Sequence, residues 1–279
     1  MPILTGPLCA RCGDLLDSPA ANAAIPEGGP LRSGLCRVCR MVPPPFVKAV
    51  AYGPYRDPLR AAIHALKYDR VHPAARRLGG LVAVAIGQLA AEAPAEMLVV
   101  PVPLHRSRYA QRGFNQARSL AVHAIAALRR THPPMRLTLA SSALLRLRPT
   151  ESQTGLTSRE RRLNVRGVFS VPEPGAVAGR DVLLIDDIFT TGATVRAAAQ
   201  ALVKAGAASV WVATLARATR TIAFRSGEAI FEDENDDIDM AGTAQAPTLD
   251  RFSFHYAGHS AGRADYEGSI HSSQDQPSF

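Results

Sequence analysis

The sequence predicts an α/β protein: a mostly parallel β-sheet flanked by helices, with a small four-cysteine module before it and an acidic segment after it. Three observations support this fold class. Short apolar runs alternate with helical patterns between residues 46 and 220, as in βαβ units. Two C-x-x-C motifs stand before residue 42. Beyond residue 220 the periodic patterns end, and acidic residues outnumber basic ones.

The alternating patterns give the order of the elements. The apolar residues 182–185 predict a strand that is buried on both faces, because neither face is polar. Three prolines at 43–45 predict a stiff linker, so we expect a module at 1–42, a domain at 46–220 and a tail at 221–279. The predicted strands are 46–52, 97–102, 143–147, 182–185 and 210–215, and the predicted helices are 59–67, 74–91, 116–130 and 195–205.

Charge separates a basic body from the acidic C-terminal segment. The chain carries a formal net charge of +8, but residues 221–279 hold three basic and eleven acidic residues, which leaves +16 on residues 1–220. A body this basic favours polyanions such as phosphates, pyrophosphate or nucleic acid. The acidic block at 232–237 and the aperiodic residues after it predict a disordered tail, either merely solvated or screening the basic body.

The four cysteines predict a metal site. Cys9 and Cys12 form one C-x-x-C motif, and Cys36 and Cys39 form the other. Two knuckles of this spacing favour structural Zn²⁺ bound by four thiolates, with a pair of disulfides or a redox dithiol as alternatives. No apolar signal segment precedes Cys9, so we expect a cytoplasmic protein, in a compartment where disulfides are rare. No stretch has the roughly 20 apolar residues that a membrane span needs.

Two carboxylates follow the apolar run 182–185, at the sheet edge where ligands of open α/β sheets bind. We call Asp186 and Asp187 the acid pair; adjacent carboxylates suit the vicinal hydroxyls of a ribose. The loop after them offers hydroxyls and backbone N–H groups at a helix N-terminus, which suit a phosphate. The alternative is an acid pair that caps a helix and a glycine that only allows a turn. The loop residues are Thr190, Thr191, Gly192, Ala193 and Thr194.

This run resembles the phosphoribosyl pyrophosphate (PRPP) motif of type I phosphoribosyltransferases. The resemblance implies that Asp186 and Asp187 bind the ribose 2- and 3-hydroxyls, and that the loop binds the 5-phosphate. It also implies Mg²⁺, bound together with PRPP. Some purine salvage enzymes have an aspartate where this chain has Thr190, and a hydroxyl is a much weaker base. We therefore expect purine salvage less than other uses of this site.

A cluster of arginines follows the predicted strand 97–102. Arg106, Arg108 and Arg112 lie within seven residues, and guanidinium groups at a strand end suit pyrophosphate. The alternative is a solvated surface.

A polar, arginine-rich segment contains Gln153, Arg161 and Asn164. Such a segment beside a phosphate site could close over it as a lid, or could be an ordinary surface loop.

Taken together and in this order, these motifs resemble the ComF family, also called competence-protein-F or GntX-like proteins. They include Lys67-Tyr68, Pro-Val-Pro-Leu-His at 101–105 and Arg-Gly-Phe-Asn-Gln at 112–116, and they cover residues 9 to about 217. The family pairs a zinc ribbon with a phosphoribosyltransferase-like domain. The resemblance implies a role in competence and in handling single-stranded DNA, with DNA and DNA-uptake proteins as partners. It leaves open an active phosphoribosyltransferase of nucleotide metabolism or a non-catalytic PRPP sensor.

Overall fold

The computed structural model describes residues 6–16, 34–68, 72–149, 165–218, 220–225 and 228–233. All of these residues belong to one compact unit, residues 1–242, and the second unit is residues 243–279. In the part of the chain that is described, no helix is long and apolar enough to cross a membrane.

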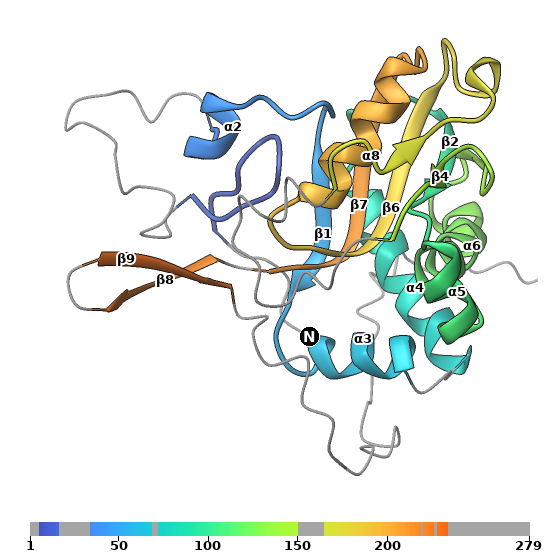
Figure 1. Ribbon diagram of the computed structural model, residues 1–279. Coiled ribbons are helices and arrows are strands. Elements are labelled where there is room, and N and C mark those ends of the chain that lie inside the picture. The colour runs from blue at the N-terminus through green and yellow to red at the C-terminus, as the bar shows by residue number, and fades with distance from the viewer. Residues whose placement is uncertain are drawn as a thin grey trace, which may run out of the picture. The chain divides into compact units, whose positions relative to one another are not determined.

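Five parallel strands form the central sheet, in the spatial order β1-β7-β6-β2-β3 (Figure 1). Strand β6 is central, between β7 and β2, and its long apolar run fits a position that is covered on both faces. The strands are β1 (Ala49–Pro54), β2 (Glu96–Pro101), β3 (Arg136–Leu139), β6 (Asp181–Phe189) and β7 (Ser209–Arg217).

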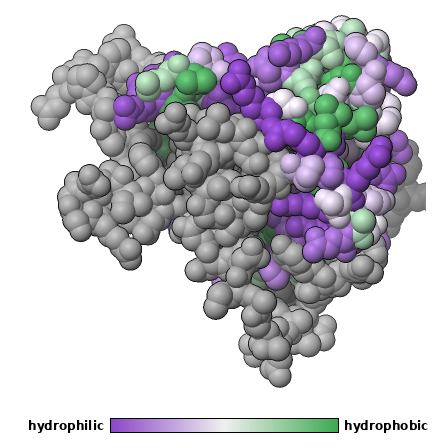
Figure 2. Space-filling model, in the orientation of Figure 1, coloured by the Kyte–Doolittle hydropathy of each residue, from purple (hydrophilic) through white to green (hydrophobic). Residues whose placement is uncertain are grey.

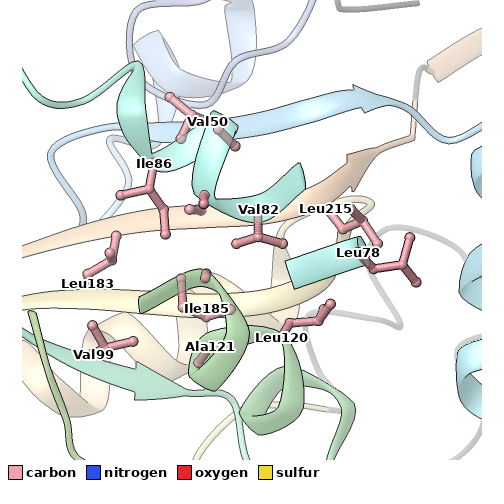
Figure 3. Close-up of a cluster of buried hydrophobic side chains, with 14 of the residues drawn as sticks. Val50, Leu78, Val82, Ile86, Val99, Leu120, Ala121, Leu183, Ile185 and Leu215 are labelled. Atoms are coloured by element: carbon pink, nitrogen blue, oxygen red, sulfur yellow. The ribbon is translucent and has the colours of Figure 1, made fainter. Parts of the chain in front are cut away.

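Alternate side chains of β6 enter two different hydrophobic clusters, as the period of two in a strand requires. Leu183 and Ile185 pack with helices on one face of the sheet (Figure 3). Val182 and Leu184 pack on the other face, with α8 and the four cysteines. The helices of the first face are α3 (Leu59–Tyr68), α4 (His72–Gly87) and α6 (Gln116–Thr131), and α8 is Ala193–Lys204.

Short elements surround this sheet. Figure 2 shows that small hydrophobic groups lie among hydrophilic residues on the described part of one face. Exposed apolar side chains include Met41 and Val42 at the end of α2, and Leu145 and Leu147 in and just after β4. The short elements are α2 (Arg37–Met41), α5 (Arg106–Arg112), β4 (Leu145–Arg146), β5 (Phe169–Ser170), η2 (Pro174–Ala176), β8 (Arg220–Arg225) and β9 (Glu228–Asp233).

The predicted α/β class and parallel sheet are confirmed, with differences at the element ends. Strand β1 begins three residues later than predicted, and the strand predicted at 143–147 is only the two-residue β4. Strand β3 and helix α5 were not predicted at all. No residue of α5 is buried, so it has no apolar period to reveal it.

The beginning of the acidic segment contains two strands. Strands β8 and β9 pair antiparallel, from Arg220 opposite Asp233 to Arg225 opposite Glu228. This hairpin lies within the segment 221–279, for which the sequence predicts a mostly disordered tail. Residues 234–279 lie outside the described residues.

Candidate functional site

The acid pair lies where the connections of the sheet change direction. From β2 the chain passes through α6 to β3 on one side, whereas from β6 it passes through α8 to β7 on the other. Strands β2 and β6 are neighbours, and Pro101 pairs with Ile185, the residue before Asp186. The loops that follow the two strands therefore begin side by side. Ligands of open α/β sheets bind at such a switch point.

Asp186 and Asp187 still belong to β6, which runs on to Phe189. The two carboxylates are held differently. Asp187 forms an ion pair with Lys67 of α3, with 3.1 Å between Oδ2 and Nζ. The backbone N–H of Asp187 donates to Oδ1 of Asp186 over 2.9 Å. The charge of Asp187 is therefore neutralised by Lys67 of α3. Within the described residues, Asp186 forms no ion pair as short as this one.

Burial, followed by the negative charge of Asp187, raises the pKa of Asp186 to about 7. The backbone N–H of Asp187 and the cations Lys67 and Arg146 act in the opposite direction. Near neutral pH, Asp186 thus stands between its protonated and ionised forms. A ligand that presents hydroxyls or a cation to this carboxyl group would draw it toward the ionised form.

The Thr190–Thr194 loop joins β6 to α8. Thr191 is buried, and its hydroxyl accepts a hydrogen bond from the backbone N–H of Ala193 over 3.3 Å. Gly192 has a φ of +74°, in the left-handed region that favours glycine, and it begins α8. Twelve helical residues follow, so their dipole favours an anion at this end.

Phe189 fixes the turn of this loop. A Cβ atom on Gly192 would lie 2.5 and 2.6 Å from two ring carbons of Phe189, so only glycine lets the loop pass this close to the ring. The ring also packs edge-on against Phe46, with 6.2 Å between centroids. The loop is therefore shaped by side chains that lie beneath it.

The loop after β2 contains α5 and carries the predicted pyrophosphate arginines. The His105 side chain caps α5 by accepting a hydrogen bond from the backbone N–H of Ser107. Helical spacing turns Arg108 and Arg112 to one face and Arg106 roughly 200° away from Arg108. Arg108 and Arg112 are partly buried and Arg106 is exposed. The three arginines do not converge on one point from this helix.

Sequence reasoning missed two cations at the acid pair. Lys67 belongs to a motif of the ComF family that gives it no role, and no motif contains Arg146 of β4. Burial lowers the pKa of Arg146; the charge of Arg108 lowers it further and that of Asp186 raises it. Arg146 is thus close to both Arg108 and Asp186. No local pattern marks it, because the segment that brings it there is far from β6 in sequence.

The predicted lid residues Gln153, Arg161 and Asn164 lie outside the described residues. The two ends of that segment are described, and they meet. Arg148 donates from Nη2 to the carbonyl oxygen of Arg166 over 2.8 Å. The two-stranded sheet β4-β5 continues this contact toward Arg146. The described residues on the two sides of this segment are therefore joined to each other, next to the strand that carries Arg146.

The four cysteines form one buried cluster, which we call the cysteine cluster. All four are free thiols, and their sulfur atoms lie within 4.8 Å of one another. The Sγ atoms of Cys12 and Cys36 are 3.6 Å apart, close to the roughly 3.8 Å edge of a tetrahedral zinc–thiolate site. Hydrogen bonds, first from Cys12, lower the pKa of Cys36 to about 7. This donor set is compatible with zinc.

The cluster packs on the sheet rather than standing apart from it. Ala49 of β1 donates its backbone N–H to the carbonyl oxygen of Arg11, in the first knuckle, over 2.7 Å. The cysteines share a hydrophobic cluster with residues of β6 and β7. The predicted boundary at residues 42–46 thus marks a change of composition and not a gap in packing.

Two buried or partly buried arginines of the sheet domain reach the cluster. Arg217, the last residue of β7, lies 3.9 Å from Sγ of Cys12 and forms an ion pair with Asp14 at 3.3 Å. Burial lowers the pKa of Arg217, but Asp14 and Cys12 raise it above its usual value. Arg196 of α8 lies 3.8 Å from Sγ of Cys39. Neither contact has a signal in local sequence.

Comparison with known proteins gives a consistent result. The family model of the phosphoribosyl transferase domain matches residues 117–250. The DNA utilization protein YhgH of Escherichia coli O157:H7 is 32% identical over 216 residues, which cover 75% of this chain and 84% of that protein. Competence protein F of Haemophilus influenzae is 27% identical over 215 residues, covering 76% and 85%. Competence protein ComFC of Bacillus subtilis is 39% identical over 121 residues, covering 43% and 44%.

The parallel sheet, the loop at its switch point and the matched model define a protein with a phosphoribosyltransferase-type domain. The chain belongs to the ComF family, as the order of its motifs predicts. Its four-cysteine cluster and its parallel sheet are as expected for that family resemblance.

Proposed function

We propose that this protein binds PRPP, or a closely related ribose phosphate, together with Mg²⁺ at the carboxyl end of β6. The observation that carries the proposal is the acid pair, which lies in the strand directly before the Thr190–Thr194 loop and α8. Asp186 and Asp187 would bind the ribose hydroxyls, and the loop would bind the 5-phosphate. Mg²⁺ would add a bridge between hydroxyl and phosphate oxygens.

A second cationic group favours PRPP over ribose 5-phosphate. The Thr190–Thr194 loop can accept one phosphate. The charges of Asp186 and of Arg108 in α5 both act on Arg146, so Arg146 links the acid pair to the loop that follows β2. Arginine binds phosphate oxygens through two N–H groups at once, so Arg146 suits a pyrophosphate. A ligand with anionic groups at both ends of its ribose, such as PRPP, would contact both the Thr190–Thr194 loop and Arg146.

Calorimetric titration with PRPP, with and without Mg²⁺, tests this proposal. We expect Mg²⁺-dependent binding that is lost in the double variant Asp186→Asn/Asp187→Asn. Asp181→Asn is a matched control, because Asp181 begins the same strand and accepts a hydrogen bond from Ser209 at the opposite end. Ribose 5-phosphate should bind more weakly than PRPP. Equal binding of PRPP by the folded double variant would contradict the site.

The cysteine cluster is proposed to hold structural Zn²⁺. Four buried thiols this close together fit a tetrahedral ion, and such a small segment has little core of its own. Elemental analysis of the purified protein should give one zinc per chain. Cys36→Ser should lower that content, whereas replacing an exposed residue of the same helix region, Arg37→Ser, should not.

The biological role is proposed to be the use of DNA, because the relatives carry the names DNA utilization protein and competence protein. The net charge of +16 on residues 1–220 supports contact with a polyanion. Single-stranded oligonucleotide binding, followed by fluorescence anisotropy, should weaken steeply as salt rises. Exposed arginines such as Arg129 and Arg130 should contribute, and Asp187→Asn should have little effect. Salt-independent binding would contradict this role.

Transfer of the phosphoribosyl group is the second candidate function. The cation Arg146, whose pKa responds to Asp186 and to Arg108, favours it, since a departing pyrophosphate needs its negative charge neutralised. The nitrogen nucleophile is unidentified, so the test incubates PRPP and Mg²⁺ with a panel of nitrogen bases and measures released pyrophosphate. Release that requires both a base and Asp187 would support transfer. Mg²⁺-dependent PRPP binding without release for any base would favour a sensing role.

A further inference from the structure

The cysteine cluster and the Thr190–Thr194 loop are connected through one buried side chain. Arg217 has only 3% of its surface exposed. Its Nη2 atom lies 3.9 Å from Sγ of Cys12, and its guanidinium group pairs with Asp14 at 3.3 Å. The same guanidinium carbon lies 4.2 Å from the centroid of the Phe189 ring. One planar group therefore touches the cluster on one side and an aromatic ring on the other.

Phe189 carries this contact to the loop. Its ring is buried, and it lies so close to Gly192 that a Cβ atom there would be 2.5 Å from it. Gly192 is the residue at which the loop becomes α8. Any shift of the Phe189 ring must therefore move the turn that presents backbone N–H groups to a phosphate. The path from Cys12 to Gly192 consists of direct contacts.

A second contact ties the other end of the loop to the same cluster. Arg196, in the first turn of α8, donates its backbone N–H to the carbonyl oxygen of Gly192 over 2.8 Å. Its side chain reaches Sγ of Cys39 at 3.8 Å and the carbonyl oxygen of Val42 at 3.1 Å. The loop is thus held from Phe189 on one side and from α8 on the other. Each C-x-x-C motif holds one of these contacts.

Charge explains why a metal would matter to these arginines. Four thiolates around a divalent cation leave a net negative charge, which the Arg217 and Arg196 guanidiniums lie close enough to neutralise. Within the described residues, Nε and Nη1 of Arg217 have no hydrogen-bond partner. The position of the guanidinium group therefore depends on Asp14, on Sγ of Cys12 and on the ring of Phe189. A buried cation with so few partners moves when one of them is lost.

We propose that Arg217 is a positioning residue that couples the two sites, so that metal at the cysteine cluster and a ribose phosphate at the Thr190–Thr194 loop strengthen each other's binding. The proposal rests on the proposed PRPP site. By linkage, the factor by which zinc raises PRPP affinity equals the factor by which PRPP raises zinc affinity. A coupling of about tenfold is expected, within the usual range for such linkage.

The equilibrium test measures zinc affinity by competition with a chromogenic chelator, with and without saturating PRPP and Mg²⁺. Wild-type protein should hold zinc about tenfold more tightly with PRPP present. Arg217→Met should abolish this difference while still binding zinc and PRPP separately. Arg180→Met is the matched control, because Arg180 is exposed and pairs with Glu96 of β2. Unchanged zinc affinity when PRPP is bound, or intact coupling in folded Arg217→Met, would overturn the proposal.

A second measurement needs neither a variant nor PRPP. Hydrogen–deuterium exchange of the peptide covering residues 186–200 is compared in zinc-loaded and chelated wild-type protein, with the β2-β3 region as internal reference. Faster exchange at residues 190–196 after zinc removal, with the reference unchanged, supports the coupling even if PRPP never binds. Identical exchange in this peptide overturns it. Failure of the PRPP site and failure of the coupling are thereby distinguished.

Discussion

The two loops that meet at the switch point are built in opposite ways. The loop after β6 is packed from below by Phe189, contains the buried Thr191 and is tied to the cysteine cluster through Arg196. The loop after β2 continues into α5, which has no buried residue and is capped by His105 and Gly113 at its two ends. One loop is fixed before any ligand arrives, whereas the other presents long side chains at the surface.

This difference fits two different tasks. Backbone N–H groups bind a phosphate well only if they already point at it, because ordering them on binding costs entropy. Arginine side chains reach further and adjust, which suits a group that arrives or departs. The fixed loop thus corresponds to the proposed 5-phosphate and the exposed loop to the proposed pyrophosphate. Four pairs of variants test this contrast.

Alanine in the two loops should have unequal effects on stability. Gly192 and Gly113 both have positive φ angles, +74° and +78°, so each substitution strains the backbone by about 1 to 2 kcal/mol. At Gly192 the new methyl group also collides with Phe189, while at Gly113 nothing lies within 4 Å. Urea unfolding should show Gly192→Ala losing about 2 to 4 kcal/mol of unfolding free energy. Equal losses in the two variants would remove the distinction between the loops.

The acid pair between the loops should make stability depend on pH. The pKa of Asp186 is raised to about 7, first by burial and then by Asp187, so the folded state binds more protons than the unfolded state between about pH 4 and 7. Its stabilising contribution is complete below that window and is lost as the pH rises through about 7. The unfolding free energy of Asp186→Asn minus that of wild type should therefore increase by on the order of 1 to 2 kcal/mol between pH 5 and pH 8. This range is reduced from the full linkage value because Asp186 is partly exposed to solvent.

This experiment uses urea unfolding without Mg²⁺ at several pH values. Asp181→Asn, at the other end of β6, serves as the control. A stability difference between Asp186→Asn and wild type that does not change with pH would show that Asp186 titrates at an ordinary pKa.

Two arginines of the exposed loop should differ in ligand binding. Arg108 is partly buried and close to Arg146, whereas Arg106 is exposed and turned away. If this loop binds pyrophosphate, Arg108→Ala should weaken PRPP binding about tenfold, and Arg106→Ala by less than about twofold. Calorimetry with inorganic pyrophosphate as competitor locates the loss. An equal effect of both variants would mean that only the general positive charge matters.

The smallest effect is expected at Lys67, the cation of Asp187. Lys67→Met removes the 3.1 Å ion pair and a positive charge that opposes the raised pKa of Asp186. The pKa of Asp186 should therefore rise further, by up to about one unit, in a carboxyl NMR titration. Lys48→Met, which breaks the more exposed pair with Glu92, should leave it unchanged. No shift on Lys67→Met would show that Lys67 does not oppose the raised pKa of Asp186.

Local patterns predicted what depends on neighbouring residues. The strand before the acid pair, the helix after the loop and the C-x-x-C motifs are each contained in a few consecutive residues. Contacts such as Arg217 with Cys12 join residues 205 positions apart, and no periodicity reports them. Lys67 and Arg146 reach the acid pair for the same reason, through the order of strands and helices in the sheet. The sequence thus predicts the motifs of the candidate site but not the contacts of Lys67 and Arg146 with it.

The hairpin β8-β9 was missed for a different reason. Each of its strands contains a short apolar run, at residues 222–224 and 229–231, and Ser226-Gly227 between them is a turn signal. The overall acidity of residues 221–279 hid this pattern, because composition was averaged over the whole segment. The number of acidic and basic residues over a long segment indicates how soluble that segment is. It says little about the conformation of any six consecutive residues within it.

The packing of the cysteines against the sheet sets a condition on how this protein can be shortened or can evolve. Phe46, Ala49 and Val210 share one hydrophobic cluster with all four cysteines. A chain that lost residues 1–42 would uncover this apolar surface, which would then favour aggregation or a substitute partner. A descendant that abandoned the cysteines would have to fill the same volume with apolar side chains of its own. The cysteine module therefore covers part of the hydrophobic core of the sheet domain. Only changes that keep this part of the core covered preserve the fold of the domain.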